Sequence, residues 1–248
     1  MKTPLTVLLS FHLLGNALLL WLGYTWLGIP ESNTAHLLLS VAALLVFICA
    51  TLWLHGTAFV YFSRETGRGL RQATVAALRH LPALAALAGL AVLLYAALMW
   101  ANGMLDAPAF RVASWLTLTI RKPVPPARVL LIFQALVWLL RWLLLPALLI
   151  PPAAAISANG FAGFKRFARR WELLRSLKVF ALVLGAVWVP LKLLAWVPKM
   201  PNFSAEMASL LVRAAAAYLL SAGLLLVLER IASAGSPSLS HRSSSAVP

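Results

Sequence analysis

The sequence contains 248 residues, of which 62% are hydrophobic and only 11% are charged. A soluble domain carries about 25% charged residues, so this chain cannot cover a water-facing globule and its apolar surface must face lipid. The 21 Lys and Arg residues outnumber the 6 Asp and Glu residues, an excess that in a soluble protein would suggest nucleic acid. In so apolar a chain we attribute it to cytoplasmic loops and anionic lipid headgroups, and we expect no nucleic-acid partner.

Six stretches contain the roughly 20 apolar residues that a helix needs to cross the hydrocarbon core of a bilayer. They cover residues 5–27, 36–62, 82–100, 129–153, 178–197 and 207–228. The first is longer than the apolar core of a signal peptide and lacks a small-x-small cleavage site, so we interpret it as a retained helix. We expect an all-α polytopic bundle that forms one transmembrane domain over residues 1–232. The Ser/Pro/Gly-rich residues 233–248 predict a disordered cytoplasmic tail.

The distribution of Lys and Arg predicts the orientation in the membrane. Thirteen lie at the N-terminus, in the 63–81 and 154–178 loops and at the C-terminal end, and three lie inside spans. The opposite side holds five, namely Arg111, Arg121, Lys122, Arg128 and Lys199. Because the richer side is cytoplasmic in multi-pass proteins, both termini are expected in the cytoplasm.

The 101–128 connection is the exception, because it places four basic residues on the predicted outer side. It contains an apolar piece, residues 110–120, that is too short to span a bilayer. We expect an interfacial helix there, since a re-entrant segment would need protein or water around its backbone polar groups. Pro123, Pro125 and Pro126 favour an extended stretch before the fourth span.

Shifting the chain against itself by 96 positions reveals a candidate internal repeat. The informative matches are Gly67 with Gly163, Arg79 with Arg175, Gly89 with Gly185 and Trp100 with Trp196. The shift places the second span on the fourth and the third on the fifth, so the two copies would run in the same direction. Chance matching in a Leu/Ala-rich chain is the alternative explanation.

Each cytoplasmic linker predicts an amphipathic helix at the headgroup boundary. In the second linker, Phe161, Phe164, Phe167 and Trp171 recur at steps of three and four, and cations occupy the other positions. The candidate contacts to anionic lipid are Arg68, Arg71, Arg79, Lys165, Arg166, Arg169, Arg170 and Arg175. A loop that fixes the topology and merely rests on the bilayer would show the same pattern.

The segment GRGLRQATVAALRHLPALAALAGL (67–90), echoed by GFAGFKRFARRWELLRSLKVFALVLGAV (160–187), resembles a pattern of several uncharacterised bacterial six-span families. It is similar in this respect to the membrane domain attached to some glycerophosphodiester phosphodiesterases. The resemblance covers about residues 51–197, rests on the pattern of turn, basic helix and span, and includes no catalytic domain. It implies a protein of the bacterial cytoplasmic (inner) membrane and carries over no functional residue.

Polar side chains inside the predicted spans are candidate functional groups, because they are costly at membrane depth. They are His12, Asn16, His55, Arg141, Lys192 and Arg213. Lys192 and Arg213 are expected to extend to the outer interface, whereas Arg141 is near mid-span and needs a carbonyl, Asn16, a His, water or an anion as its partner. We expect no Asp or Glu inside a span, which disfavours proton-coupled and cation-coupled carriers and favours an anionic ligand.

The chain contains no protease, hydrolase or phosphate-loop motif and no clustered metal ligands in sequence, and its only cysteine is Cys49. We therefore expect no enzyme activity, catalytic residue, metal or cofactor. The composition favours a non-enzymatic accessory or scaffolding membrane protein that engages anionic lipid or a protein partner. The alternative is a transporter or channel for a small anionic or lipid-like solute, with Arg141 near its centre. The oligomeric state stays open.

Overall fold

The computed structural model describes all residues except 1–4, 31, 64–68, 167–175 and 235–248, and the predicted tail lies almost wholly outside the described residues. No β-strand occurs in the part of the chain that is described. The helices are α1 (Leu5–Leu27), α2 (Thr34–Phe62), α3 (Leu70–Arg79), α4 (Leu81–Asn102), α5 (Asp106–Ile120), α6 (Pro126–Leu139), the π-helical segment η1 (Leu140–Leu144), α7 (Leu145–Asn159), the 3-10 turn η2 (Gly160–Ala162), α8 (Gly163–Arg166), α9 (Leu177–Ala195) and α10 (Phe203–Ala234).

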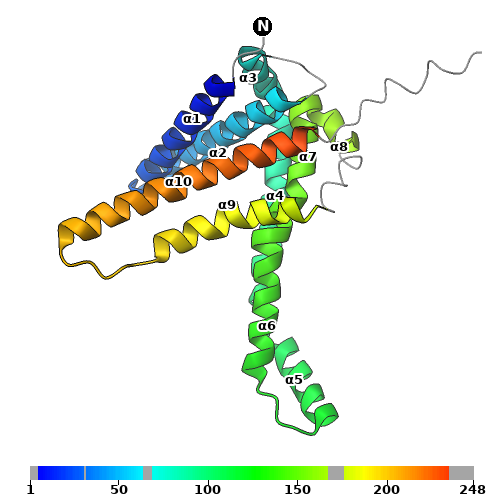
Figure 1. The fold of residues 1–248 in the computed structure, drawn as a ribbon. Helices are drawn as coiled ribbons and strands as arrows, with labels where there is room; N and C mark the ends of the chain where they lie inside the picture. Colours follow the sequence, from blue (N-terminus) through cyan, green and yellow to red (C-terminus); the bar gives the residue numbers. More distant parts are fainter. Residues whose placement is uncertain (1–4, 31, 64–68, 167–175, 235–248) are drawn as a thin grey trace, which may run out of the picture.

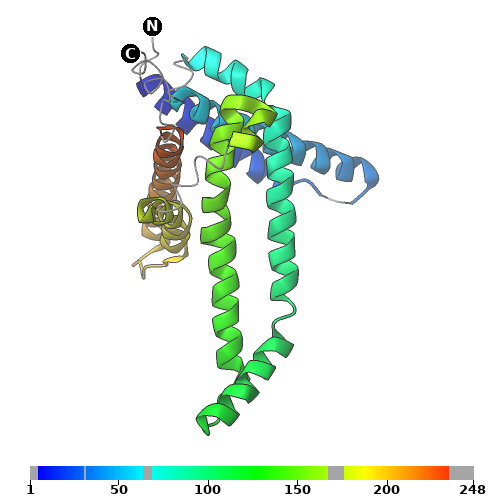
Figure 2. The ribbon, with the colours of Figure 1, turned by 90° about the vertical axis from the view of Figure 1, so that its right-hand side faces the viewer.

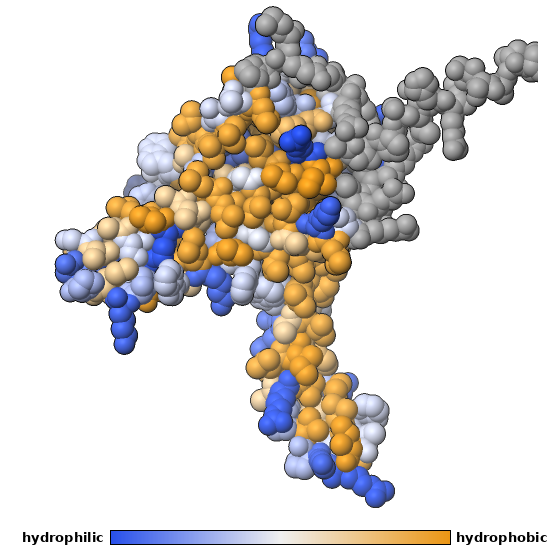
Figure 3. Space-filling model, in the orientation of Figure 1, coloured by the Kyte–Doolittle hydropathy of each residue, from blue (hydrophilic) through white to orange (hydrophobic). Residues whose placement is uncertain are grey.

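Six helical stretches among the described residues are long and apolar enough to cross a membrane, which confirms the prediction of an all-α polytopic protein with six spans. The fourth is a composite of α6, η1 and α7. Its π-helical turn precedes Pro146, and a proline has no N–H to donate to the carbonyl one turn earlier. The N–H of Leu145 donates to the carbonyl of Leu140, five residues before it. Hydrophobic side chains cover most of the visible face of the molecule (Figure 3).

The spans form two groups that diverge from a common end. α1, α2, α9 and α10, which we call the bundle, run obliquely, while α4 and the α6–α7 rod form a long hairpin (Figure 1). The two groups meet near α3, α7 and α8, and we call this region the α3 end. The loops that follow α1, α4 and α9 lie at the opposite ends of the two groups, away from the α3 end (Figures 1 and 2). Where the groups separate, α9 crosses and contacts η1.

α10 is the central element of the bundle, because it contacts α9, α2, α1 and α7. Leu228 packs with Ala147, Val179 and Val183 in one buried cluster, and a second cluster joins Phe59, Ala154 and Ala232. Hydroxyl groups of α10 donate to carbonyls of its neighbours. Such interhelical hydrogen bonds fix helix rotation where lipid supplies no competing water.

The 101–128 connection forms α5, which crosses the far end of the hairpin and does not fold back between α4 and α6 (Figure 2). Ala109 and Ala113 of α5 pack on Val129 of α6, while Phe110 and Trp115 are exposed. The position of α5 at the membrane interface stays a prediction.

The helix boundaries agree with the 96-residue offset to within one residue. α4 begins at Leu81 and α9 at Leu177, and α2 ends at Phe62 while α7 ends at Asn159. The first linker forms α3 as expected, with Ala73, Ala76 and Ala77 on its buried face. Residues 167–175 of the second linker lie outside the described residues, so the comparison of the two linkers stays a prediction.

Candidate functional site

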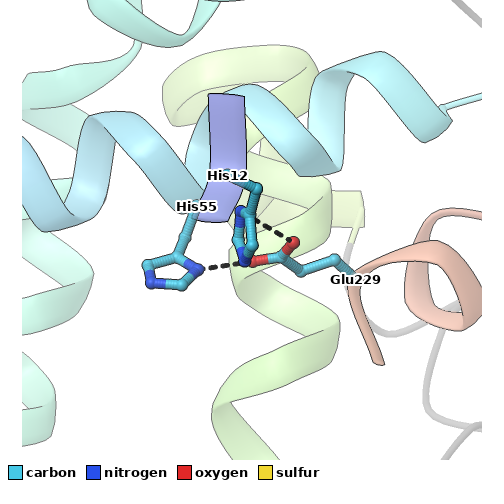
Figure 4. Close-up of side chains that lie close together, drawn as sticks. All are labelled: His12, His55 and Glu229. Atoms are coloured by element: carbon cyan, nitrogen blue, oxygen red, sulfur yellow. Dashed lines mark hydrogen bonds and ion pairs between the residues drawn. The ribbon is translucent and has the colours of Figure 1, made fainter. Parts of the chain in front are cut away.

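Three side chains that can bind a cation converge from three helices of the bundle (Figure 4). His12 comes from α1, His55 from α2 and Glu229 from α10, and one ligand atom from each lies within 4.8 Å of the others. His55 Nδ1 is 2.5 Å from Glu229 Oε1, a short hydrogen bond. His12 Nδ1 is 4.0 Å from Glu229 Oε2, and the two imidazole rings meet edge to face with centroids 5.2 Å apart.

The interior of this cluster is buried and incompletely paired. His12 and Glu229 are 1% and 3% exposed, while the His55 side chain is partly accessible. Both ring nitrogens of His12 and Oε2 of Glu229 are buried without a hydrogen-bond partner among the described residues. No Lys or Arg in that part of the chain forms an ion pair with Glu229. Buried polar groups normally have partners, so this arrangement calls for a further group at the cluster.

The helix registers that form the cluster are fixed by contacts one turn away. Ser233 and Phe59 each follow a cluster residue by four positions, and the Ser233 hydroxyl donates to the Phe59 carbonyl at 2.9 Å. On α1, Leu8 is fully buried one turn before His12, so both lie on the face that packs inward. His12 and His55 are each about 10 Å along their helices from the α3 end, because a helix rises 1.5 Å per residue.

The expectation that no carboxylate lies inside a span is wrong at Glu229. The predicted sixth span ended at Leu228, whereas α10 continues to Ala234 and buries Glu229. A buried carboxylate at this depth is compatible with a protein that handles cations. The signal available in the sequence was that His12, His55 and Glu229 all lie nearer the predicted cytoplasmic end than the outer end of their helices.

Arg141, on η1, is held by aromatic groups. Its Nη2 donates to the Tyr95 hydroxyl at 3.1 Å, and its guanidinium carbon lies 4.9 Å and 5.7 Å from the ring centroids of Tyr95 and Trp142. The partners considered from the sequence did not include a tyrosine. Asn16 instead donates to the carbonyl of His12 in its own helix.

Arg213 is buried and reaches the end of α9, and its expected extension to the outer interface stays a prediction. It is 7% exposed, and its Nη1 donates to the carbonyls of Leu194 and Trp196 at the end of α9. The last carbonyls of a helix lack partners and carry negative partial charge, so Arg213 caps α9 across the α9–α10 pair. Lys192 is exposed, and its ammonium group lies 5.4 Å from the centroid of the Trp188 ring, one turn further from the end of α9, so its extension to the outer interface stays a prediction.

The candidate lipid contacts are only partly described. Arg71, Arg79, Lys165 and Arg166 are exposed at the α3 end, where Arg166 donates to the Asn159 side chain. Arg68, Arg169, Arg170 and Arg175 lie outside the described residues. The described cations lie on α3 and α8, beyond the ends of the spans.

Comparison with protein families, curated proteins and solved structures finds no match for this chain. Function must therefore be inferred from the chemistry of the side chains. Two imidazoles and one carboxylate form a ligand set that suits zinc, iron and similar divalent ions.

Proposed function

We propose that this protein is a non-enzymatic multi-pass membrane protein that binds a divalent transition-metal ion between His12, His55 and Glu229. The observation that carries the proposal is the convergence of three ligand groups from three helices, with three of their polar atoms buried and unpaired. Glu229 has no Lys or Arg partner among the described residues, and a buried carboxylate with only imidazole partners favours a bound cation, because a charge in an apolar interior is costly.

The separations of the ligand atoms are compatible with small side-chain movements on metal binding. Tetrahedral zinc ligands at about 2.0–2.2 Å from the metal are roughly 3.3 Å apart. The His12–Glu229 separation of 4.0 Å is wider and the His55–Glu229 separation of 2.5 Å is narrower. A rotation of the Glu229 carboxylate away from His55 and towards His12 would make the distances more equal.

The ligand types favour zinc, iron, cobalt or nickel over magnesium and calcium. Imidazole nitrogen suits these transition ions, whereas magnesium and calcium prefer sites made wholly of oxygen. Three protein ligands leave a fourth coordination position for water or another small ligand. The accessible His55 edge is the side of the cluster where an ion can exchange.

A second role, engagement of anionic lipid or a protein partner in an accessory function, is favoured by the exposed cations of the α3 end. Arg71, Arg79, Lys165 and Arg166 lie beyond the spans on α3 and α8. Each such cation contributes about 1 kcal/mol near an anionic membrane surface. This role is compatible with metal binding, because it uses different residues.

Titration calorimetry on chelator-treated protein in detergent tests the metal proposal. We expect about one Zn²⁺ or Co²⁺ per chain and no comparable Mg²⁺ binding. Loss of a group that only hydrogen-bonds to a metal ligand typically lowers metal affinity by about 10–100-fold. His12→Gln and Glu229→Gln each remove a ligand itself, so each should reduce Zn²⁺ affinity by at least that factor.

The matched control is His36→Gln, because His36 lies partly exposed in the first turn of α2, away from the cluster, and is hydrogen-bonded to Ser32. It should bind Zn²⁺ as the wild type does. Equal Zn²⁺ affinity in the wild type and in Glu229→Gln would overturn the proposal, as would a wild type that binds no transition ion.

A further inference from the structure

An aromatic slot lies where the bundle and the hairpin diverge. It is lined by Trp138 and Trp142 from the hairpin and by Leu184, Val187, Trp188 and Leu191 from α9, and its volume is about 160 Å³. All six lining residues are apolar or aromatic. Because α9 and the hairpin separate beyond their crossing (Figure 1), the slot lies in a wedge between two spans.

Two cations lie beside this slot, each over an aromatic ring that lines it. Arg141 lies over the Trp142 ring and Lys192 lies over the Trp188 ring, and both rings line the slot. Neither cation forms an ion pair with an Asp or Glu among the described residues. An apolar slot whose walls carry two unneutralised positive charges is complementary to a ligand with an apolar body and an anionic group.

Arg141 is the deeper of the two cations. It is about 22 Å along the α6–η1 rod from Pro126 at the helical rise, whereas Lys192 is less than one turn from the end of α9. The Tyr95 hydroxyl accepts a hydrogen bond from Nη2 of Arg141, and the buried Nε of Arg141 has no hydrogen-bond partner among the described residues. A carboxylate can accept from the N–H groups of a guanidinium that point in one direction, in the paired geometry that makes such contacts strong.

We propose that the slot between η1 and α9 binds a long-chain fatty-acid anion, with its carboxylate at Arg141 and part of its acyl chain against Trp138, Trp142 and Trp188. The slot is far smaller than the roughly 300–1,000 Å³ of sites that enclose drug-sized molecules, so it accepts part of one chain. A carboxylate is also a small anion that two hydrogen bonds from Arg141 can satisfy, which favours it at this depth. The proposal is independent of the metal site, which lies on other helices.

Photolabelling with a diazirine-bearing palmitate tests the slot. The probe is added to purified full-length protein in detergent, irradiated, and the labelled peptides are identified by mass spectrometry. We expect labelling of residues 138–142 and 184–191, and much weaker labelling there by the corresponding diazirine alcohol, which has no charge. Arg141→Gln should reduce labelling by the palmitate probe about tenfold, the effect expected when a hydrogen bond to a charged group is lost.

Two variants keep this test decisive. Arg128→Gln is the matched control, because Arg128 is an exposed arginine on α6 of the same rod, and it should label as the wild type does. Val187→Phe fills the slot while leaving Arg141 in place, and should also abolish labelling. The proposal would be overturned by equal labelling with the alcohol, by unchanged labelling of Arg141→Gln, or by labels confined to other helices. A diazirine phospholipid serves as a third probe, and a slot labelled by that probe alone would also overturn it.

Discussion

His55 and Glu229 are 174 positions apart in the chain, yet Nδ1 of the first and Oε1 of the second are 2.5 Å apart inside the bundle. Ser233, one turn after Glu229, donates to the carbonyl of Phe59, one turn after His55. Two consecutive turns of α10 are therefore tied to two consecutive turns of α2. This double contact positions Glu229 beside His12 and defines the site on which the proposed function rests.

Metal binding should stabilise the wild type but not Glu229→Gln. A ligand that binds only the folded state at about 100 times its Kd adds roughly 2.7 kcal/mol to the free energy of unfolding. We expect Zn²⁺ to raise the thermal unfolding midpoint of chelator-treated wild type, measured in detergent, and to leave that of Glu229→Gln unchanged. An equal Zn²⁺-dependent rise in both proteins would place the metal elsewhere.

Arg213→Met should destabilise the α9–α10 pair. The substitution keeps an apolar stem but leaves the carbonyls of Leu194 and Trp196 without their donor, at a cost of about 2 kcal/mol. Unfolding in mixed micelles provides the measurement. Lys199→Met, at an exposed position in the adjoining loop, should change the free energy of unfolding by less than about 0.5 kcal/mol. If the two variants are equally stable, the capping role assigned to Arg213 is incorrect.

Gly163→Ala and Gly89→Ala should have effects of opposite sign. A Cβ atom on Gly163 would lie 2.6 Å from the backbone of Ala155 and Ile156, whereas nothing lies within 4 Å of one on Gly89. The first change should destabilise the protein by about 1–3 kcal/mol through overpacking. The second should stabilise α4 by up to about 1 kcal/mol, because alanine is less flexible than glycine in the unfolded chain. Thermal unfolding midpoints of both variants check this, and a Gly163→Ala protein as stable as the wild type would contradict the tight turn.

Cysteine accessibility tests the predicted orientation. In a Cys49→Ser background, Ser32→Cys reports on the α1–α2 loop and Gln72→Cys on α3, and both positions are exposed. If the basic side is cytoplasmic, a membrane-impermeant maleimide should label Ser32→Cys in intact bacterial cells and Gln72→Cys only after lysis. The reverse pattern would invert the topology.

The spans could be predicted from the sequence because hydropathy alone specifies them, and α3 could be predicted from its amphipathic pattern. The cluster could not, since it depends on how α1, α2 and α10 are rotated about their axes, and hydropathy carries almost no information on rotation when every face is apolar. Glu229 was also assigned to a span end, where a carboxylate is ordinary. Arg213 is a similar case, because its partners are backbone carbonyls that become available only where α9 ends.

The contact between the Tyr95 hydroxyl and Arg141 could not be predicted from the sequence either. Arg141 lies in the π-helical turn before Pro146, where the helix departs from regular α geometry. A proline in an apolar span predicts a local irregularity. It does not predict which neighbouring helix the displaced side chain will meet.

X-ray absorption at the zinc edge, on protein loaded with one Zn²⁺ per chain, tests the metal site most directly. A site formed by His12, His55 and Glu229 predicts a first shell of nitrogen and oxygen only. It also predicts outer-shell scattering typical of two imidazoles, reduced to one in His12→Gln and unchanged in His36→Gln. A shell that contains sulfur, as binding at the exposed Cys49 would give, or a spectrum without imidazole scattering, would contradict it.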